Sequence, residues 1–237
     1  MDSKKGHLYL IPCTLGDTPP LEVLPLLVKK AVEHIDHYIV EHEKSARHFI
    51  KNIVPRKSQP DLHFQHINKF THDTEIPEML APCFEGHDVG VISDAGCPGI
   101  ADPGALVVRQ AHLQGIRVVP LVGPSSLLLA MMASGFNGQN FAFNGYLPID
   151  KQERKTELKR LERLSAEQNQ SQLFIETPYR NNQMLESLLQ ILHPETQLCV
   201  ACDITLPSEY IHTTSVTLWK KIKVDLHKRP TLFILQK

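Results

Sequence analysis

The stretch from Val89 to Gly104 reads VGVISDAGCPGIADPG and organises the rest of the chain. Its first four residues, Val89–Ile92, form an apolar run that predicts a buried β-strand, and the glycines and prolines that follow predict a loop. A strand that ends in such a loop places backbone groups at the carboxyl edge of a sheet, where open α/β sheets bind their ligands. Because Gly96 and Gly99 lack a Cβ atom, a ligand could approach the main chain closely there. The stretch therefore predicts a ligand-binding loop at a sheet edge.

Strands and helices are predicted to alternate on both sides of this stretch. In the first half, we expect strands at Leu8–Pro12, Tyr38–Val40, Leu62–Gln65, Val89–Ile92 and Arg117–Leu121, and helices at Leu21–Ile35, Ile76–Glu85 and Gly104–Gln114. In the second half, we expect helices at Leu127–Ala133 and Asp150–Gln170, and strands at Gln172–Ile175, around Cys199, after Tyr210 and at Thr231–Leu235. This rhythm predicts an α/β protein with two α/β domains, of which residues 1–121 carry a mostly parallel sheet and residues 122–237 a mixed sheet.

The composition is that of an ordinary globular protein, with 42% apolar residues, 22% charged residues and a formal net charge of −1. A chain with this charge has no global field that would attract nucleic acid or an anionic membrane, although a local basic patch would survive. No apolar run approaches the roughly 20 residues that a membrane span needs. The first residues also lack the apolar core of a signal peptide. We therefore expect a cytoplasmic protein that does not associate with membranes.

The five cysteines are odd in number and scattered, which favours reduced thiols over a disulfide framework. Cys199 and Cys202 have C-x-x-C spacing, but they lie in a β-like run, so we expect buried core thiols there. His63, His66 and His72 suit no zinc pattern, and we expect no metal site. The dinucleotide-binding, P-loop and nucleophile-elbow motifs do not occur either.

The pattern ISDAG-x-P-x-I-x-DPG resembles the central loop of the tetrapyrrole methylase superfamily. More narrowly, it resembles the branch that methylates a ribose 2′-hydroxyl in small-subunit ribosomal RNA. Three further segments match in the same order, namely GPSS at 123–126, FAFNGYLP at 141–148 and Glu-x-Pro-x-Arg at 176–180. The loop after the first strand matches in part, through Pro12, Gly16 and Asp17. The resemblance covers nearly the whole chain.

This resemblance implies that S-adenosylmethionine is the cofactor and that it binds in a cleft between the two domains. The cofactor contacts that it implies are Pro12, Asp94, Ala95, Gly96, Ile100, Ser125, Ser126, Thr177 and Thr213. Read without the resemblance, the two serines could simply cap the helix that follows them. A methyltransferase of this kind mainly has to align a nucleophile with the activated methyl group.

A ribose hydroxyl must lose its proton as it attacks, and Glu41 and Glu176 are the candidate catalytic bases. Arg47 and Arg180 could bind a phosphate next to the target sugar, because arginine pairs with phosphate through two hydrogen bonds. The segment after the second predicted strand reads EHEKSAR, which departs from the acidic-Asp-Thr-Arg run of the resembled branch. Here the alternative is that Glu41 caps a helix and Arg47 is a solvated helix residue.

The predicted helix Asp150–Gln170 is rich in lysine and arginine, and these side chains could contact phosphates. Glutamates alternate with them along the sequence. That alternation favours a solvated helix with ion pairs between residues four apart.

Two alternatives to an RNA methyltransferase remain open. One is a methylase of a tetrapyrrole or another small molecule, which fits the superfamily and the nearly neutral charge. The other is a non-catalytic protein that binds S-adenosylmethionine, which the altered EHEKSAR segment makes conceivable. The expected partners are ribosomal RNA or the small ribosomal subunit and, because the superfamily is commonly dimeric, a second copy of the chain.

Overall fold

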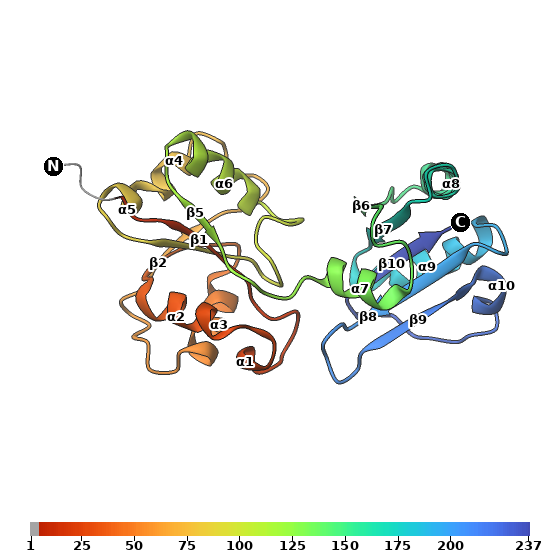
Figure 1. Cartoon of the computed structure of the whole chain (residues 1–237), viewed down its shortest axis with the longest axis horizontal. Helices are drawn as coiled ribbons and strands as arrows, with labels where there is room; N and C mark the ends of the chain where they lie inside the picture. Colours follow the sequence, from red (N-terminus) through yellow and green to blue (C-terminus); the bar gives the residue numbers. More distant parts are fainter. Residues whose placement is uncertain (1–4) are drawn as a thin grey trace. The chain divides into compact units, whose positions relative to one another are not determined.

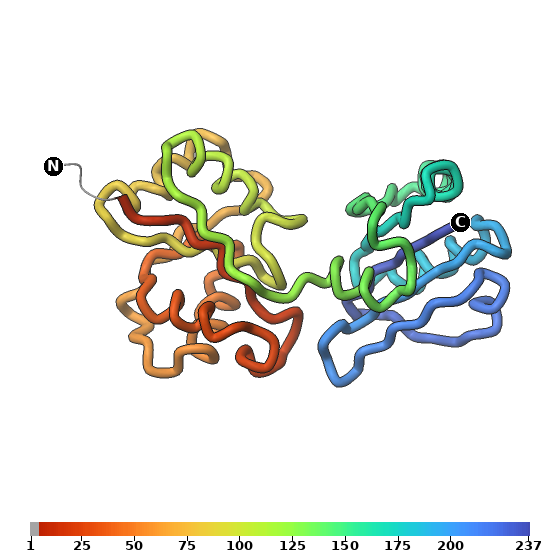
Figure 2. The backbone as a smooth tube through the Cα atoms, viewed as in Figure 1, coloured from red at the N-terminus to blue at the C-terminus, as the bar shows by residue number. Residues whose placement is uncertain are grey.

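The structure is a computed structural model that describes residues 5–237. The chain divides into two compact units; the first ends at Ser125 and the second comprises Ser126–Lys237. Each unit is an α/β domain with its own five-stranded sheet (Figure 1). The tube drawing follows the chain through the first sheet and its helices before it enters the second unit (Figure 2).

The sheet of the first unit is entirely parallel and has the strand order β3-β2-β4-β1-β5. Its strands are β1 (Leu8–Ile11), β2 (His37–Val40), β3 (His63–His66), β4 (Val89–Ile92) and β5 (Val118–Pro120). All four residues of β4 are buried, as expected for a strand covered on both faces. Because the strands are parallel, the segments that follow them leave the sheet at one common edge.

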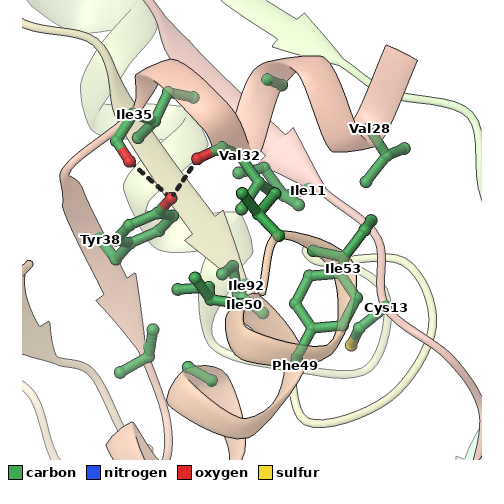
Figure 3. Packing of buried hydrophobic residues seen from close by; sticks show 14 of the residues in the cluster. Ile11, Cys13, Val28, Val32, Ile35, Tyr38, Phe49, Ile50, Ile53 and Ile92 are labelled. Atoms are coloured by element: carbon green, nitrogen blue, oxygen red, sulfur yellow. Dashed lines mark hydrogen bonds between the residues drawn. The ribbon is translucent and has the colours of Figure 1, made fainter. Parts of the chain in front are cut away.

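Helices cover both faces of this sheet (Figure 1). On one face lie α1 (Pro20–Val23), α2 (Leu26–His34) and α3 (Glu43–Ile53), and on the other α4 (Ile76–Met79), α5 (Ala81–Phe84) and α6 (Gly104–Leu113). Tyr38 is buried under α2, and its hydroxyl donates to the carbonyl oxygens of Ile35 at 2.6 Å and Val32 at 3.3 Å (Figure 3). This aromatic side chain thereby enters the core without leaving a polar atom unpaired.

The prediction of one continuous helix over Leu21–Ile35 is wrong. The structure has two helices there, and Leu24 between them is extended, with φ −110° and ψ 136°. Pro25 explains the break, because proline lacks an N–H group and disfavours helical geometry in the residue before it. The predicted helix Ile76–Glu85 is likewise divided into α4 and α5, with Pro82 in the first turn of α5.

The second unit has a mixed sheet with the order β6-β7-β10-β8-β9. Its strands are β6 (Phe141–Tyr146), β7 (Ser171–Ile175), β8 (Gln197–Cys202), β9 (Tyr210–Ser215) and β10 (Thr231–Gln236). Only β6 and β7 are parallel neighbours; β10 is antiparallel to β7 and β8, and β9 is antiparallel to β8. The carboxyl ends of β6 and β7 therefore lie together.

One face of this second sheet is covered by α8 (Lys151–Gln168), α9 (Asn181–Ile191) and α10 (Val216–Trp219). Trp219 is fully buried in that core, and its indole N–H donates to the carbonyl of Leu198 at 2.7 Å. The helix α7 (Ser126–Ser134) contacts β9 and β10, and Thr213 donates to the carbonyl of Ser134. Side chains alternate between the two faces of a sheet, and Leu198 points into the core under α8, α9 and α10. Thr213 is paired with Cys199, the next residue, so it points to the other face, and α7 covers that face.

The cysteines carry free thiols, and Cys199 and Cys202 are buried on β8, so the prediction of core thiols is confirmed. Burial raises the pKa of both thiols, which keeps them protonated. Within residues 5–237, no helix is both long and apolar enough to cross a membrane.

Candidate functional site

The loop after β4 is held in shape by Asp102. One oxygen of its carboxylate, Oδ1, accepts the backbone N–H of Gly99 at 2.8 Å and of Gly104 at 2.7 Å. Between these anchors the backbone is left-handed at Gly99 (φ 83°) and at Ala101 (φ 62°). A left-handed alanine is uncommon, and such residues persist where the surroundings fix them. The loop therefore has a defined shape rather than the freedom that its glycine content suggests.

The loops after β1, β4 and β5 pack against one another at the carboxyl edge. The N–H of Cys13 donates to the carbonyl of Gly96 at 3.0 Å. A Cβ atom on Gly96 (φ 70°) would lie 3.0 Å from Leu15 Cδ2, and one on Gly123 would lie 2.2 Å from Pro12 Cβ. A side chain at Gly123 would collide with Pro12, and at Gly96 the left-handed backbone itself favours glycine. The predicted contact residues Pro12 and Gly96 are thus brought together with the loop that leads to Ser125.

Three carboxylates influence one another at this edge. Burial raises the pKa of Glu41, which directly follows β2, and the carboxylates of Asp94 and Asp102 raise it further. Burial also raises the pKa of Asp102, against the effect of its two N–H donors. Asp94 is 44% exposed and accepts a hydrogen bond from His42 at 2.6 Å. Like charges so arranged favour a proton or a cationic ligand between them.

Asp102 and His42 were not among the predicted site residues. The second oxygen of Asp102, Oδ2, is buried and has no hydrogen-bond partner in the part of the chain that the structure describes. Asp102 belongs to the DPG end of the Val89–Gly104 stretch, which is the signal that could have identified it. His42 has no comparable signal, because its partner Asp94 is 52 residues further along the chain.

The remaining predicted cofactor contacts of the first unit are Ala95, Ile100 and Ser125, in the segments after β4 and β5. Ala95 is exposed, and Ile100 leaves 54% of its surface in solvent although it is apolar. Ser125 ends the unit, and Ser126 begins α7 in the second unit. An exposed apolar side chain such as that of Ile100, with small residues around it, can pack against a flat, uncharged ring of a ligand.

Arg47 is already engaged within the first unit. Its guanidinium donates to Glu43 Oε1 at 2.7 Å and to the carbonyl of Gln59 at 2.6 Å, and it lies over the ring of Phe64. Its side chain remains 35% exposed. Arg47 is therefore not the freely solvated helix residue of the alternative interpretation. Its exposed third remains available to a phosphate, but the rest of the side chain is held by partners within the unit. Glu41 does not cap α3, whose N-cap residue is His42.

Glu176 and Arg180 form an ion pair at the end of β7 in the second unit. Arg180 Nη2 lies 2.7 Å from Glu176 Oε1, and the side chain of Glu176 is only 1% exposed. Burial by itself would raise the pKa of Glu176, but the hydrogen bonds from Arg180 and from the N–H of Thr177 outweigh it and lower that pKa. Arg180 lines a hollow of about 540 Å³ that is also lined by Tyr146.

We expect the Glu176 ion pair to make stability depend on acid pH. Because the folded-state pKa is lowered, the stabilisation is fully present above the unfolded value of about 4.3 and is lost as the pH falls through the folded-state pKa. Glu176→Gln should lower the free energy of unfolding by about 1–3 kcal/mol at pH 7. This deficit should shrink below about pH 4. Urea titrations over pH 3–7 measure it, with the exposed Glu195→Gln as control; a deficit that is constant over this range would contradict the ion-pair account.

Thr177 and Thr213 are not brought together within the second unit. Thr177 follows β7, whereas Thr213 lies in β9, three strand positions away, or about 14 Å at the usual strand spacing. The register places Thr213 level with Leu173, four residues before Thr177. The hydroxyl of Thr213 already donates to Ser134.

Comparison with protein families gives a match to the model of the Tetrapyrrole (Corrin/Porphyrin) Methylases, over residues 10–218. Among curated proteins, the chain is 28% identical to the ribosomal RNA small subunit methyltransferase I of Escherichia coli O157:H7 across 99% of its own length and 78% of that protein. It is 31% identical to the protein of the same name from Xylella fastidiosa, across 98% of the chain and 81% of the relative.

Solved structures show the same fold at low sequence identity. The methyltransferase CobJ superposes with a TM-score of 0.64 at 16% identity, across 98% of this chain and 94% of that one. Uroporphyrin-III C-methyltransferase from Thermus thermophilus, crystallised with S-adenosylhomocysteine, gives a TM-score of 0.58 at 17% identity, across 98% of both chains. The predicted fold, two α/β domains like those of these methylases, is confirmed.

Proposed function

Since the chain belongs to the tetrapyrrole (corrin/porphyrin) methylase family, we propose that it is an S-adenosylmethionine-dependent methyltransferase that acts on a ribose 2′-hydroxyl of small-subunit ribosomal RNA. The observation that carries the choice of acceptor is Glu41. It is a half-buried carboxylate with a raised pKa at the same strand edge as the ligand loop. A hydroxyl acceptor requires such a proton acceptor. The relatives that align with 98–99% of this chain are named ribosomal RNA small subunit methyltransferases, which agrees with this choice.

The residues of the β4 edge fit S-adenosylmethionine. This cofactor is cationic at its sulfur and its amino group, and Asp94 and Asp102 contribute negative charge where it would bind. The unpartnered Oδ2 of Asp102 supplies an acceptor, and Ile100 an exposed apolar surface. In the first unit, the residues that would hold the cofactor are Pro12, Asp94, Ala95, Gly96, Ile100 and Ser125. When bound, it supplies a methyl group already activated by the positive sulfur.

Of the two predicted bases, Glu41 suits the role better than Glu176. A raised pKa brings a carboxylate closer to the pH at which proton transfer is efficient. Glu176 has a lowered pKa and shares its Oε1 with Arg180. We therefore assign proton removal from the ribose hydroxyl to Glu41, and the positioning of Arg180 to Glu176.

Arg180 is the better placed of the two predicted phosphate ligands. A third of its side chain is exposed, it lines the hollow beside Tyr146, and its buried Nε has no partner within residues 5–237. A phosphate could satisfy this N–H. For Arg47 we retain the proposed role of a phosphate ligand, through the third of its side chain that is exposed. Its hydrogen bonds to Glu43 and Gln59 fix the orientation of the guanidinium.

Tetrapyrrole or another small molecule remains the second candidate acceptor, because the similar solved structures include a uroporphyrin-III methyltransferase. For a ribosomal substrate we also propose a cytoplasmic location. A homodimer is proposed as well; Leu128 and Met132, one turn apart on α7, are 54% and 79% exposed and offer an apolar contact surface.

The proposed function predicts methyl transfer to ribosomal RNA. The protein is incubated with S-adenosylmethionine carrying a labelled methyl group and with small ribosomal subunits from a strain that lacks its own enzyme of this type. We expect label in the RNA and none with Asp94→Arg, because that exposed position would then repel a cationic cofactor. If a tetrapyrrole accepts the label and the RNA does not, the second candidate replaces the first.

A further inference from the structure

A groove of about 610 Å³ lies between α8 and α9 in the second unit, and we refer to it as the α8–α9 groove. From α8 it is lined by Lys151, Arg154, Lys155 and Lys159, and from α9 by Glu186 and uncharged polar side chains. Four cations therefore face one carboxylate, in a chain whose formal net charge is −1. Neither Glu41 nor the Glu176–Arg180 pair lines this groove.

The three lysines form a continuous stripe. They are four residues apart, so they share one face of α8 and extend over about 12 Å at 1.5 Å per residue. All three are exposed. Within residues 5–237, no carboxylate lies within ion-pairing distance of them, although Glu153, Glu157 and Glu162 belong to the same helix.

The arginines of α8 behave differently. Arg160 pairs with Glu157 at 2.6 Å, and Arg163 lies 3.8 Å from Glu167. The sequence-based expectation of a solvated helix with ion pairs is therefore met by these arginines and not by the lysines of the groove. Ion pairing on α8 is confined to side chains outside the groove lining.

A buried arginine lies within the groove lining. Arg154 is only 3% exposed; its Nη1 donates to the carbonyl of Ile149 at 3.2 Å, and its Nε has no partner in the described chain. A buried guanidinium is unfavourable unless it is paired, and Arg154 makes no ion pair within the described residues; the nearby carboxylate of Asp150 accepts the N–H groups of Gln152 and Glu153 instead. An anion in the groove would supply both the charge and the missing acceptor.

We propose that the α8–α9 groove binds the phosphate backbone of the RNA substrate, through residues other than those proposed for methyl transfer. This rests on the proposed function. A stripe of about 12 Å suits successive phosphates rather than one small anion. A concave groove also admits a nucleic-acid strand, whereas a flat lipid surface would reach only its rims. Contacts to phosphates position a nucleic acid without reading its sequence. The groove would therefore position the RNA on the protein, and its bases would contribute little to the affinity.

The test compares two matched double variants of the full-length protein. Lys155→Gln/Lys159→Gln removes two charges from the groove, and Arg160→Gln/Arg163→Gln removes two charges from α8 outside it. Glutamine preserves helix propensity in both. Affinity for a small-subunit ribosomal RNA fragment is measured by fluorescence anisotropy across a salt series, without S-adenosylmethionine.

We expect the lysine variant to bind on the order of tenfold more weakly, with a salt slope smaller by about 1.4, since each lost contact to a single strand contributes about 0.7. The arginine variant should match the unsubstituted protein. Equal affinities and slopes for both variants would overturn the groove proposal and leave the proposed function standing. If the unsubstituted protein binds no RNA, both proposals fail. If the lysine variant loses affinity only for phosphatidylglycerol vesicles, the occupant is a membrane and the proposal is wrong.

Discussion

Replacing Glu41 by glutamine is expected to lower kcat for methyl transfer to RNA by about 10²–10⁴-fold, the usual contribution of a positioned base. Glutamine has the same shape but cannot take up the hydroxyl proton. The affinity for S-adenosylmethionine should change little, because Glu41 is not among the proposed cofactor contacts. Single-turnover rates and calorimetric binding measure the two quantities separately.

The pH profile distinguishes this base from a merely structural residue. Glu41 accepts a proton only when ionised, so the rate should rise with pH through its raised pKa and then become constant. Glu41→Gln should lose this rise, and the exposed control Glu22→Gln should keep it. An unchanged kcat and an unchanged profile in Glu41→Gln would show that another group removes the proton.

Replacing Trp219 by alanine is expected to destabilise the second unit by about 3–5 kcal/mol, the range found when a large aromatic side chain is removed from a core. The side chain is fully buried between β8 and α9, and its N–H is paired with Leu198. Much of the stability of a domain, typically about 5–15 kcal/mol, would be lost.

The measurement is denaturant unfolding followed by circular dichroism, because Trp219 is the only tryptophan and fluorescence would disappear with it. Trp219→Phe should retain most of the apolar contact, and its loss of the hydrogen bond should cost about 1 kcal/mol. Leu218→Ala, at a neighbour that is 48% exposed, should change stability by less than about 0.5 kcal/mol. Equal losses for Trp219→Ala and Leu218→Ala would contradict the burial of the indole.

The sequence was most informative where one local pattern decides the structure. The apolar run at Val89–Ile92 and the turn residues after it identify a buried strand and its loop without knowledge of any neighbour. The helix over Leu21–Ile35 was mistaken because its apolar spacing continues through Pro25, and the spacing alone does not show where the backbone breaks. The apolar spacing indicated a continuous helix and Pro25 indicated a break, and the structure has the break.

The interactions of the site residues depend on tertiary structure and were therefore harder to predict from the sequence. The environment of Glu41 comes from Asp94 and Asp102, which are more than 50 positions away in the chain. The three partners of Arg47 come from α3, the segment after it and β3. Glu43 is four residues before Arg47, so that one contact could have been predicted from helical spacing.

The most direct test of the proposed function is the position of the transferred methyl group. Small-subunit RNA methylated by the protein is digested to nucleosides and analysed by mass spectrometry. We predict a single nucleoside whose extra methyl group remains with the ribose when the glycosidic bond is broken. A methyl group on the base, or unmodified RNA although the protein binds S-adenosylmethionine, would contradict ribose methylation.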